Sequence, residues 1–269
     1  MKCFHHDDLD GQASGFCVYD QYHECEMREI NYGTPFPFEA IEPNEKIWIV
    51  DYSIEPSEML KLLEITTNVV WIDHHKTALE KYVGFPKEID GVRSIEDAAC
   101  ILTWRYIYPN KVVPKSINLV ADRDIWKWDF GDETKYFFAG SQLYDTSPTS
   151  EFWLKYMYQI NIDELVEQGK IIEQYKAQED KLLNKIGFDC VFEGNNCWAV
   201  NRPMISSNRI EGRIDNYDIV IFYYNDGSNW TVSLRSNKID VAFIAKNRGG
   251  GGHKSAAGFQ CRSLPFDKE

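Results

Sequence analysis

Short apolar runs alternate with segments of helical periodicity along the first half of the chain. The apolar runs at 3–4, 27–31, 47–50 and 69–72 predict strands, and the segments at 13–23, 57–65 and 96–108 predict helices. A further apolar stretch, 117–121, leads into an Asp-Arg-Asp sequence. Strands that alternate with helices are typical of a parallel sheet with helices on its faces. Residues 1–150 are therefore predicted to form an α/β domain.

The second half of the chain has a different pattern. Residues 151–186 form a long stretch of helical periodicity with charged residues between the apolar ones, and we expect it to connect two domains. Residues 187–269 are predicted to form a smaller α+β domain, with strands near 190–192, 197–200, 219–224 and 230–234. The sequence Asn225-Asp226-Gly227-Ser228 predicts a hairpin between the last two strands.

The composition is that of a soluble globular protein with a sizeable core. The chain has 269 residues, of which 43% are hydrophobic and 26% are charged. No apolar stretch reaches the roughly 18 residues that a membrane span requires, and the first residues lack the apolar region of a secretory signal. We therefore expect a cytoplasmic protein that does not bind a membrane.

The seven cysteines are odd in number and lack matched Cys-x-x-Cys pairs, which favours reduced, buried thiols over a zinc site or disulfides.

The net charge limits the class of partner. A formal charge of −13 argues against non-specific binding to long nucleic acid, because contacts to many phosphates require clustered Lys and Arg side chains. A small phosphorylated ligand is compatible with this charge, since bound divalent cations would offset several carboxylates.

Acidic residues and histidines follow three of the predicted strands. They are His6, Asp8 and Asp10 in a His-x-Asp-x-Asp-Gly pattern, Asp51, and the triplet Asp73-His74-His75. The carboxyl ends of parallel strands meet at one edge of a sheet, and ligands bind there. Any one of these aspartates alone would more simply be a helix cap or a turn residue. Several on consecutive strand ends are hard to explain as caps.

These residue types predict a metal-dependent phosphoesterase. Hard divalent cations such as Mn²⁺ and Mg²⁺ prefer carboxylate oxygens and accept imidazole nitrogens. Two such ions, about 3.5–4 Å apart, can activate a water for attack on phosphorus.

Strand alternation should send the side chains of His5 and His6 to opposite faces, so only one is expected to reach the metals. The spacing to the aspartates favours His6.

Two features of the second domain suit a phosphate. Four consecutive glycines, Gly249–Gly252, carry backbone N–H groups without side chains and can form an anion-binding concavity, although most glycine runs are turns. Asp240 is expected to cap a short helix at 241–247 before them. Arg235 should lie on the polar face of its strand, where it would either bind a phosphate or remain solvated.

With these residues in place, the chain resembles the DHH phosphoesterase superfamily, and it is most similar to the short-oligoribonuclease (nanoRNase) branch that carries a C-terminal DHHA1 domain. The motif that gives the superfamily its name stands at Asp73-His74-His75. The other motifs occur in family order over nearly the whole chain: His6-Asp7-Asp8-Leu9-Asp10-Gly11, Val50-Asp51-Tyr52-Ser53, Ala121-Asp122-Arg123-Asp124-Ile125-Trp126, and GGGGHKSAAGF at 249–259.

The resemblance implies a site with two divalent ions, usually Mn²⁺, that share the carboxylate of Asp51. The ligands of the first ion would be His6, Asp8 and Asp51. The ligands of the second would be Asp10, Asp51, His74 and Asp122.

The resemblance also implies roles in catalysis and substrate binding. His75 would face the scissile phosphate, and Asp73 would orient the neighbouring histidine. The substrate would be bound across a cleft between the DHH domain and the DHHA1 domain, by Arg235, Gly250, Gly251, Gly252 and His253. Ser207, Asn208 and Arg209, at a predicted helix start, are weaker candidates for the same cleft, with simple capping as the alternative.

The implied reaction is hydrolysis of very short oligonucleotides, such as nanoRNA and linear dinucleotides, to nucleoside 5′-monophosphates. Three alternatives stay open. The first is a phosphomonoesterase or phosphoanhydride hydrolase for 3′-phosphoadenosine 5′-phosphate or polyphosphate, and the second is a cyclic-nucleotide phosphodiesterase. The third is a nucleotide-binding regulator without catalysis, which a missing ligand would favour, and none is missing. A homodimer is compatible with the resemblance.

Overall fold

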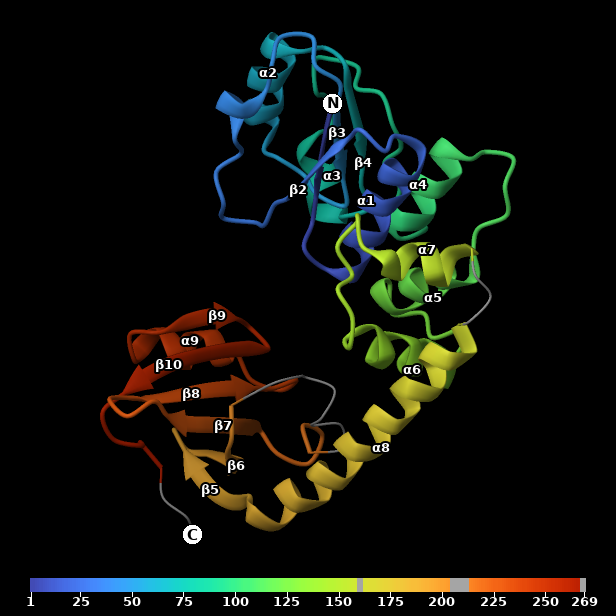
Figure 1. Ribbon diagram of the computed structural model, residues 1–269. Helices are drawn as coiled ribbons and strands as arrows, with labels where there is room; N and C mark the ends of the chain where they lie inside the picture. The colour runs from blue at the N-terminus through green and yellow to red at the C-terminus, as the bar shows by residue number, and fades with distance from the viewer. Residues whose placement is uncertain (159–161, 204–212, 267–269) are drawn as a thin grey trace. The chain divides into compact units, whose positions relative to one another are not determined.

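The computed structural model describes residues 1–158, 162–203 and 213–266 of the chain. The chain forms two compact units, Met1–Glu173 and Gln174–Glu269. The boundary falls inside the long helix α8 (Ile162–Ile186), which therefore contributes to both units (Figure 1). Helix α7 (Glu151–Tyr158) precedes α8, so the predicted helical stretch contains two helices.

Unit 1 is built on a parallel sheet of four strands in the order β2-β1-β3-β4. The strands are β1 (Lys2–His5), β2 (Glu26–Glu29), β3 (Ile47–Val50) and β4 (Val69–Ile72). Side chains of β3 alternate between two cores, with Ile47 and Ile49 on one face and Trp48 and Val50 on the other. Because both faces are covered, β1, β3 and β4 are buried throughout and appear in the sequence as continuous apolar runs. The predicted parallel sheet is confirmed.

Helices cover both faces of this sheet. Helices α1 (Leu9–Gln21) and α4 (Ala99–Ile107) contribute Val18 and Leu102 to one core, and α2 (Pro56–Ile65) contributes Met59 and Leu62 to the other. The short η1 (Phe38–Ala40) and α3 (Lys76–Lys81) lie in connecting segments. Helices α5 (Lys115–Asp124), α6 (Asp132–Ser141) and α7 share a third core with α1 and α4, and the apolar stretch 117–121 is the middle of α5.

Unit 2 is a mixed sheet of six strands in the order β5-β6-β7-β8-β10-β9. The strands are β5 (Phe188–Phe192), β6 (Asn195–Asn201), β7 (Ile219–Asn225), β8 (Trp230–Arg235), β9 (Gly251–His253) and β10 (Ala256–Cys261). Strands β6 and β7 are parallel, and the other neighbours are antiparallel. The predicted hairpin is confirmed, since β7 and β8 pair across residues 225–230. The predicted cap is confirmed too, because Asp240 accepts hydrogen bonds at the start of α9 (Val241–Asn247).

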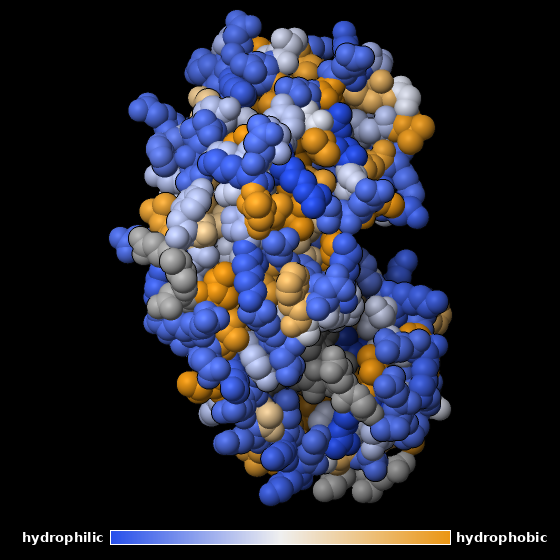
Figure 2. All heavy atoms as spheres, turned by 90° about the vertical axis from the view of Figure 1, so that its right-hand side faces the viewer, coloured by the Kyte–Doolittle hydropathy of each residue, from blue (hydrophilic) through white to orange (hydrophobic). Residues whose placement is uncertain are grey.

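Three further observations concern the molecule as a whole. None of the seven cysteines forms a disulfide within the described residues, and six of them are buried, as predicted. Among the described residues, no helix is both long enough and apolar enough to cross a bilayer. On the face that Figure 2 presents, hydrophilic residues separate the exposed apolar ones into small patches.

Candidate metal centre

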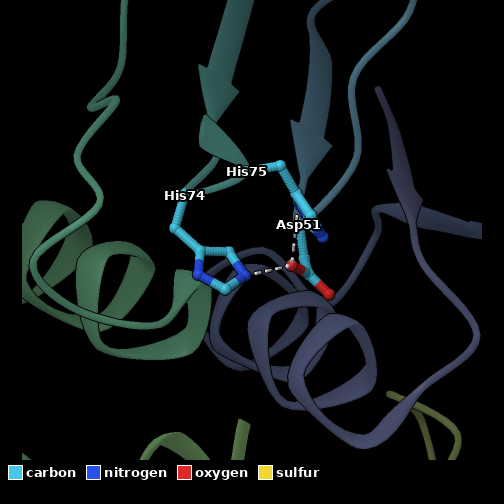
Figure 3. A group of neighbouring side chains, drawn as sticks. All are labelled: Asp51, His74 and His75. Atoms are coloured by element: carbon cyan, nitrogen blue, oxygen red, sulfur yellow. Dashed lines mark ion pairs between the residues drawn. The ribbon is translucent and has the colours of Figure 1, made fainter. Parts of the chain in front are cut away.

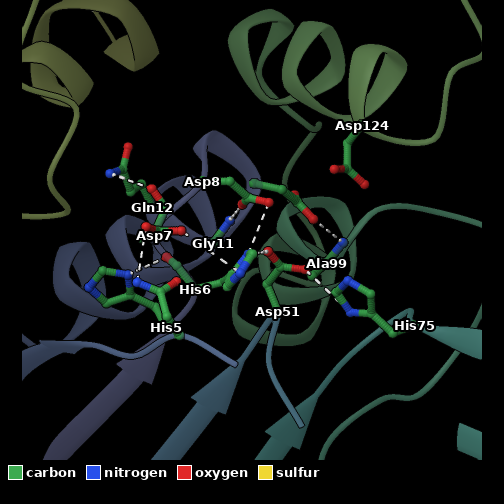
Figure 4. Close-up of polar contacts among 12 residues, drawn as sticks. His5, His6, Asp7, Asp8, Gly11, Gln12, Asp51, His75, Ala99 and Asp124 are labelled. Carbon is green, nitrogen blue, oxygen red and sulfur yellow. Dashed lines mark hydrogen bonds and ion pairs between the residues drawn. The ribbon is translucent and has the colours of Figure 1, made fainter. Parts of the chain in front are cut away.

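The candidate site lies at the point where the strand order of unit 1 reverses. Strand β1 is followed in the chain by β2 on one side and, after a crossover, by β3 on the other. Loops that leave the carboxyl ends of such strands diverge and leave a crevice between them. His6 follows β1, Asp51 follows β3 and Asp73 follows β4, so three separate segments converge at this edge (Figure 4).

The first loop is shaped by the cap of helix α1. Oδ1 of Asp8 accepts a hydrogen bond from the N–H of Gly11 at 2.9 Å, and Oδ2 of Asp8 lies 3.0 Å from Nδ1 of His6. Asp8 therefore caps helix α1 with one carboxylate oxygen and faces His6 with the other. A Cβ at Gly11 would lie 2.4 Å from the carbonyl oxygen of His6, so only glycine fits here. The ring of His5 is buried instead, with its Nδ1 2.8 Å from the carbonyl oxygen of His6.

Asp51 is the central carboxylate of the site. Its side chain is 1% exposed, and its backbone has a φ of 52°, in the left-handed region. Neither carboxylate oxygen accepts a hydrogen bond of normal geometry from the described residues. Oδ1 lies 3.3 Å from Nε2 of His74, and Oδ2 lies 3.8 Å from Nδ1 of His6 (Figure 3 shows the approach of His74). Burial raises the pKa of Asp51 well above its usual value, and the charges of Asp10 and Asp8 raise it further.

Nε2 of His74 is surrounded by carboxylate oxygens. It lies 3.6 Å from Oδ2 of Asp10, 3.3 Å from Oδ1 of Asp51 and 3.4 Å from Oδ2 of Asp124. This nitrogen is buried and also lacks a hydrogen bond within the described ranges. Asp10 is fixed by the backbone N–H groups of Ala99 and Cys100, each 2.9 Å away at the start of α4. Burial raises the pKa of Asp124 to about 7, together with the charges of Asp10 and Asp8.

These side chains form three overlapping groups whose donor atoms lie within 4.8 Å of one another. Asp51 belongs to two of the groups and His74 to two. The groups are His6, Asp8 and Asp51; Asp10, His74 and Asp124; and Asp51, His74 and His75. Nδ1 of His6, Nε2 of His74 and both oxygens of Asp51 are buried without a hydrogen bond from the described residues. Such donors fit hard divalent cations, because a cation would satisfy them. The residues present therefore fit the implied metals.

Asp73 holds His75 rather than contributing to these groups. Its Oδ1 accepts hydrogen bonds from the backbone N–H of His74 at 2.7 Å and from Nδ1 of His75 at 2.7 Å, and its Oδ2 accepts one from the hydroxyl of Ser53. Burial alone would raise the pKa of Asp73, but the hydrogen bonds from His75 and Ser53 lower it. The same hydrogen bond raises the pKa of His75. The structure thus pairs Asp73 with His75.

Asp122, a predicted ligand, makes its contacts outside these groups. Asp122 lies outside the three groups, and its carboxylate accepts hydrogen bonds from the N–H of Asp129 at 2.7 Å, from the N–H of Phe130 at 3.3 Å and from the hydroxyl of Thr134. Its oxygens are thus used to fix the segment that follows α5. Asp124 takes the position beside Asp10 and His74 that the sequence prediction gave to Asp122.

The predicted substrate residues of unit 2 are only partly free for an anion. The N–H of Gly250 donates to the carbonyl of Ala245 at 2.9 Å, and that of Gly249 to Lys246 at 3.1 Å, so these two N–H groups are not free.

Gly251, Gly252 and His253 form the exposed edge strand β9, while Arg235 is half-buried and donates to the carbonyl of Leu234 at 2.8 Å. Ser207, Asn208 and Arg209 lie outside the described residues. The substrate roles and the cleft between the domains stay predictions.

Comparisons with known proteins agree with this fold. Residues 205–267 match the family described as the DHHA1 domain. An uncharacterized protein of Acanthamoeba polyphaga mimivirus is 24% identical over 240 residues, which cover 84% of this chain and 56% of that protein. This chain therefore spans about half the length of the curated relative that it matches.

The chain is also similar to solved structures, at low sequence identity. The pGpG-specific phosphodiesterase PggH of Vibrio cholerae aligns with a TM-score of 0.60 at 14% identity, over 97% of this chain and 93% of that chain. RecJ of Thermus thermophilus in complex with Mn²⁺ aligns with a TM-score of 0.45 at 13% identity, over 96% of this chain and 49% of that chain. The chain thus matches the DHHA1 family within unit 2, and it shares the fold of a solved phosphodiesterase.

Proposed function

We propose that this protein is a metal-dependent phosphodiesterase that hydrolyses very short oligonucleotides, such as linear dinucleotides, to nucleoside 5′-monophosphates. One observation carries the proposal. The carboxylate of Asp51 is buried and accepts no hydrogen bond from the described residues, and it lies 3.3 Å from Nε2 of His74 and 3.8 Å from Nδ1 of His6. A buried carboxylate is costly unless it is paired or coordinates a metal.

The proposed ligands follow the observed groups. His6, Asp8 and Asp51 would hold one ion, and Asp10, His74, Asp124 and the shared Asp51 would hold the other. Bound there, two divalent cations would supply an activated water and neutralise charge on the phosphate. Asp8 and Asp10 are held by the ends of α1 and α4, so the ligands are positioned before a metal binds.

His75 is proposed to face the scissile phosphate. Nδ1 of its ring is 2.7 Å from the carboxylate of Asp73, which leaves Nε2 as the nitrogen for a substrate oxygen. The raised pKa keeps the ring protonated to higher pH, and an imidazolium would stabilise negative charge that develops on the phosphate. Asp73 positions this ring.

The net charge and the fold support a small substrate. A formal charge of −13 disfavours a long polyanion. The fold is shared with a phosphodiesterase whose name gives pGpG, a linear dinucleotide, as its substrate.

The test is a substrate panel with Mn²⁺. The panel contains linear dinucleotides, five-mers, 20-mers, cyclic dinucleotides, 3′-phosphoadenosine 5′-phosphate and polyphosphate. We expect nucleoside 5′-monophosphates from the dinucleotides, little turnover of the 20-mers, and no activity after removal of metal with a chelator. Asp145→Asn, a change at an exposed aspartate of the same unit, is the matched control for the aspartate variants of the Discussion and should be fully active. Exclusive release of orthophosphate would overturn the diesterase proposal.

A further inference from the structure

Arg123 is a half-buried arginine for which the described residues provide no polar partner. It is the last residue but one of α5. Within the described residues, its guanidinium makes no hydrogen bond and no ion pair. A guanidinium carries five N–H donors, and leaving them unused in a partly buried position is unfavourable.

The other arginines of unit 1 show what a structural arginine looks like in this fold. Arg93 also lies over an aromatic ring, that of Trp71, but it donates to the carbonyls of Trp71, Asp90 and Ile89 at 2.9–3.0 Å. Arg105 pairs with Asp97. An arginine near a helix C-terminus often bonds to the last carbonyl groups, yet Arg123 donates to none in the described part of the chain. A purely structural role therefore does not account for its donors.

Aromatic rings hold Arg123 in place. Its Cζ lies 3.5 Å from the ring centroid of Phe138 and 5.9 Å from that of Trp126. Trp126 has a φ of 58° in the left-handed region, which is rare for a bulky residue. The hydrogen bonds of Asp122 to the backbone of Asp129 and Phe130 fix this segment. Asp122 thus helps to build the aromatic support of Arg123.

Arg123 is close to the candidate metal centre. It precedes Asp124 in the chain, and Asp124 lies in one of the ligand groups. Burial lowers the pKa of Arg123, and the charges of Asp124 and Asp8 oppose this shift, so both carboxylates act on the guanidinium. Neither carboxylate pairs with it directly. The free donors are therefore available to an anion that approaches the metals, and phosphate oxygens match the planar guanidinium.

We propose that Arg123 binds a phosphate group of the substrate at the edge of the metal centre, with Phe138 and Trp126 fixing the plane of its guanidinium. The proposal rests on the proposed function, since it names a residue of the same site. It adds a phosphate contact inside unit 1, distinct from the residues of unit 2 that sequence indicates. Stacked and bidentate binding also predicts that lysine cannot replace this arginine fully.

The test compares Arg123→Ala and Arg123→Lys with wild type and with Arg105→Ala, an exposed arginine of the same unit. KM and kcat are measured with Mn²⁺ for two substrates, ApA and pApA, and the affinity for AMP and for adenosine is measured by calorimetry. A charged hydrogen bond to phosphate predicts that Arg123→Ala weakens AMP binding and raises KM by about tenfold or more. Arg123→Lys should lie between, and Arg105→Ala should match wild type. Adenosine binding should not change.

The two substrates locate the phosphate. A loss confined to pApA indicates the terminal 5′-phosphate, and an equal loss on ApA indicates the scissile phosphate. Either result supports the proposal, provided that Mn²⁺ stabilises the variants as it does wild type. KM and AMP affinity within twofold of wild type in Arg123→Ala would overturn it. If wild type cleaves no dinucleotide and Arg123→Ala still binds AMP more weakly than wild type, the proposed function fails while the phosphate contact stands.

Discussion

Asp51 shows how a residue that is unfavourable for the fold can suit a metal. Its buried carboxylate lies among the charges of Asp10, Asp8 and Asp124, and all of these raise its pKa. No hydrogen bond offsets this repulsion within the described residues. A bound cation would reverse the sign of the interaction, because each carboxylate would then be attracted to a shared positive charge. Stability of the metal-free protein and metal affinity therefore oppose each other at this position.

Asp51→Asn should separate these two effects. The amide keeps the shape of the side chain and removes its charge, so we expect the metal-free protein to become more stable, by about 1 kcal/mol. Turnover should fall by more than the roughly 10–100-fold that loss of an outer-shell partner costs. Thermal unfolding without metal and kcat with Mn²⁺ check both. Retained activity would contradict the shared position of Asp51 between the ions.

Asp122 and Asp124 offer a paired prediction. The N–H groups of Asp129 and Phe130 donate to different oxygens of Asp122, and Asp122→Asn replaces one of these acceptors with an NH2 group. We expect it to destabilise unit 1 by about 1–3 kcal/mol while Mn²⁺ affinity is retained. Asp124→Asn should do the opposite, with a small effect on stability and a large loss of Mn²⁺ affinity. Denaturant unfolding and calorimetric titration measure the two effects. The reverse pattern would restore Asp122 as the ligand.

The sequence could not separate these two aspartates. The rule that placed Asp51 and Asp73 uses strand ends, whereas Asp122 and Asp124 lie at the end of helix α5. At about 100° per residue, side chains two positions apart point to different sides of a helix, so only one can reach the site. Choosing between them requires the packing of α5, and the sequence motif carries no signal of that packing. The motif gives no sign of the surroundings of Arg123 either, because these also depend on the packing of α5.

At the scale of elements, continuous apolar runs were sufficient to predict the central sheet. Strands β3 and β4 have the predicted bounds because both of their faces are buried. For edge strand β2 the sequence predicts 27–31, whereas the strand is Glu26–Glu29, because an exposed strand lacks such a run. The glycines were harder to interpret. At Gly250 a Cβ would lie 2.0 Å from the carbonyl oxygen of Gly258, so close packing on β10 accounts for this glycine.

The loop between β1 and α1 provides a testable prediction at the scale of elements. In Gly11→Ala, the new Cβ would lie 2.4 Å from the carbonyl oxygen of His6, so the loop that carries His6 and Asp8 must move. We expect a destabilisation of about 2 kcal/mol or more, and weaker Mn²⁺ binding. Gln21→Ala, at the exposed end of the same helix, is the control and should bind Mn²⁺ normally. Denaturant unfolding with and without Mn²⁺ checks this. Wild-type Mn²⁺ affinity in Gly11→Ala would show that the loop geometry is not needed.

At the scale of the whole molecule, the candidate ligands all belong to unit 1. Each unit has its own apolar core, so the units can respond separately to heat. A cation that binds only the folded form of unit 1 should stabilise that unit alone. At a concentration of 100 times Kd the gain is about 2.7 kcal/mol, or roughly 5–10 °C for a unit of this size.

The size of this shift should depend on pH. Asp51, Asp10 and Asp124 have raised pKa values in the folded state, that of Asp124 to about 7. The folded form therefore binds more protons than the unfolded chain, and the metal-free unit loses stability as pH rises from about 4 to about 7. Protons also compete with Mn²⁺ for these carboxylates at low pH. Calorimetry at pH 8 and pH 5.5 should show a larger Mn²⁺-induced rise in the Tm of unit 1 at pH 8 and none in Tm of unit 2, whereas an equal rise at both pH values would exclude these carboxylates as ligands.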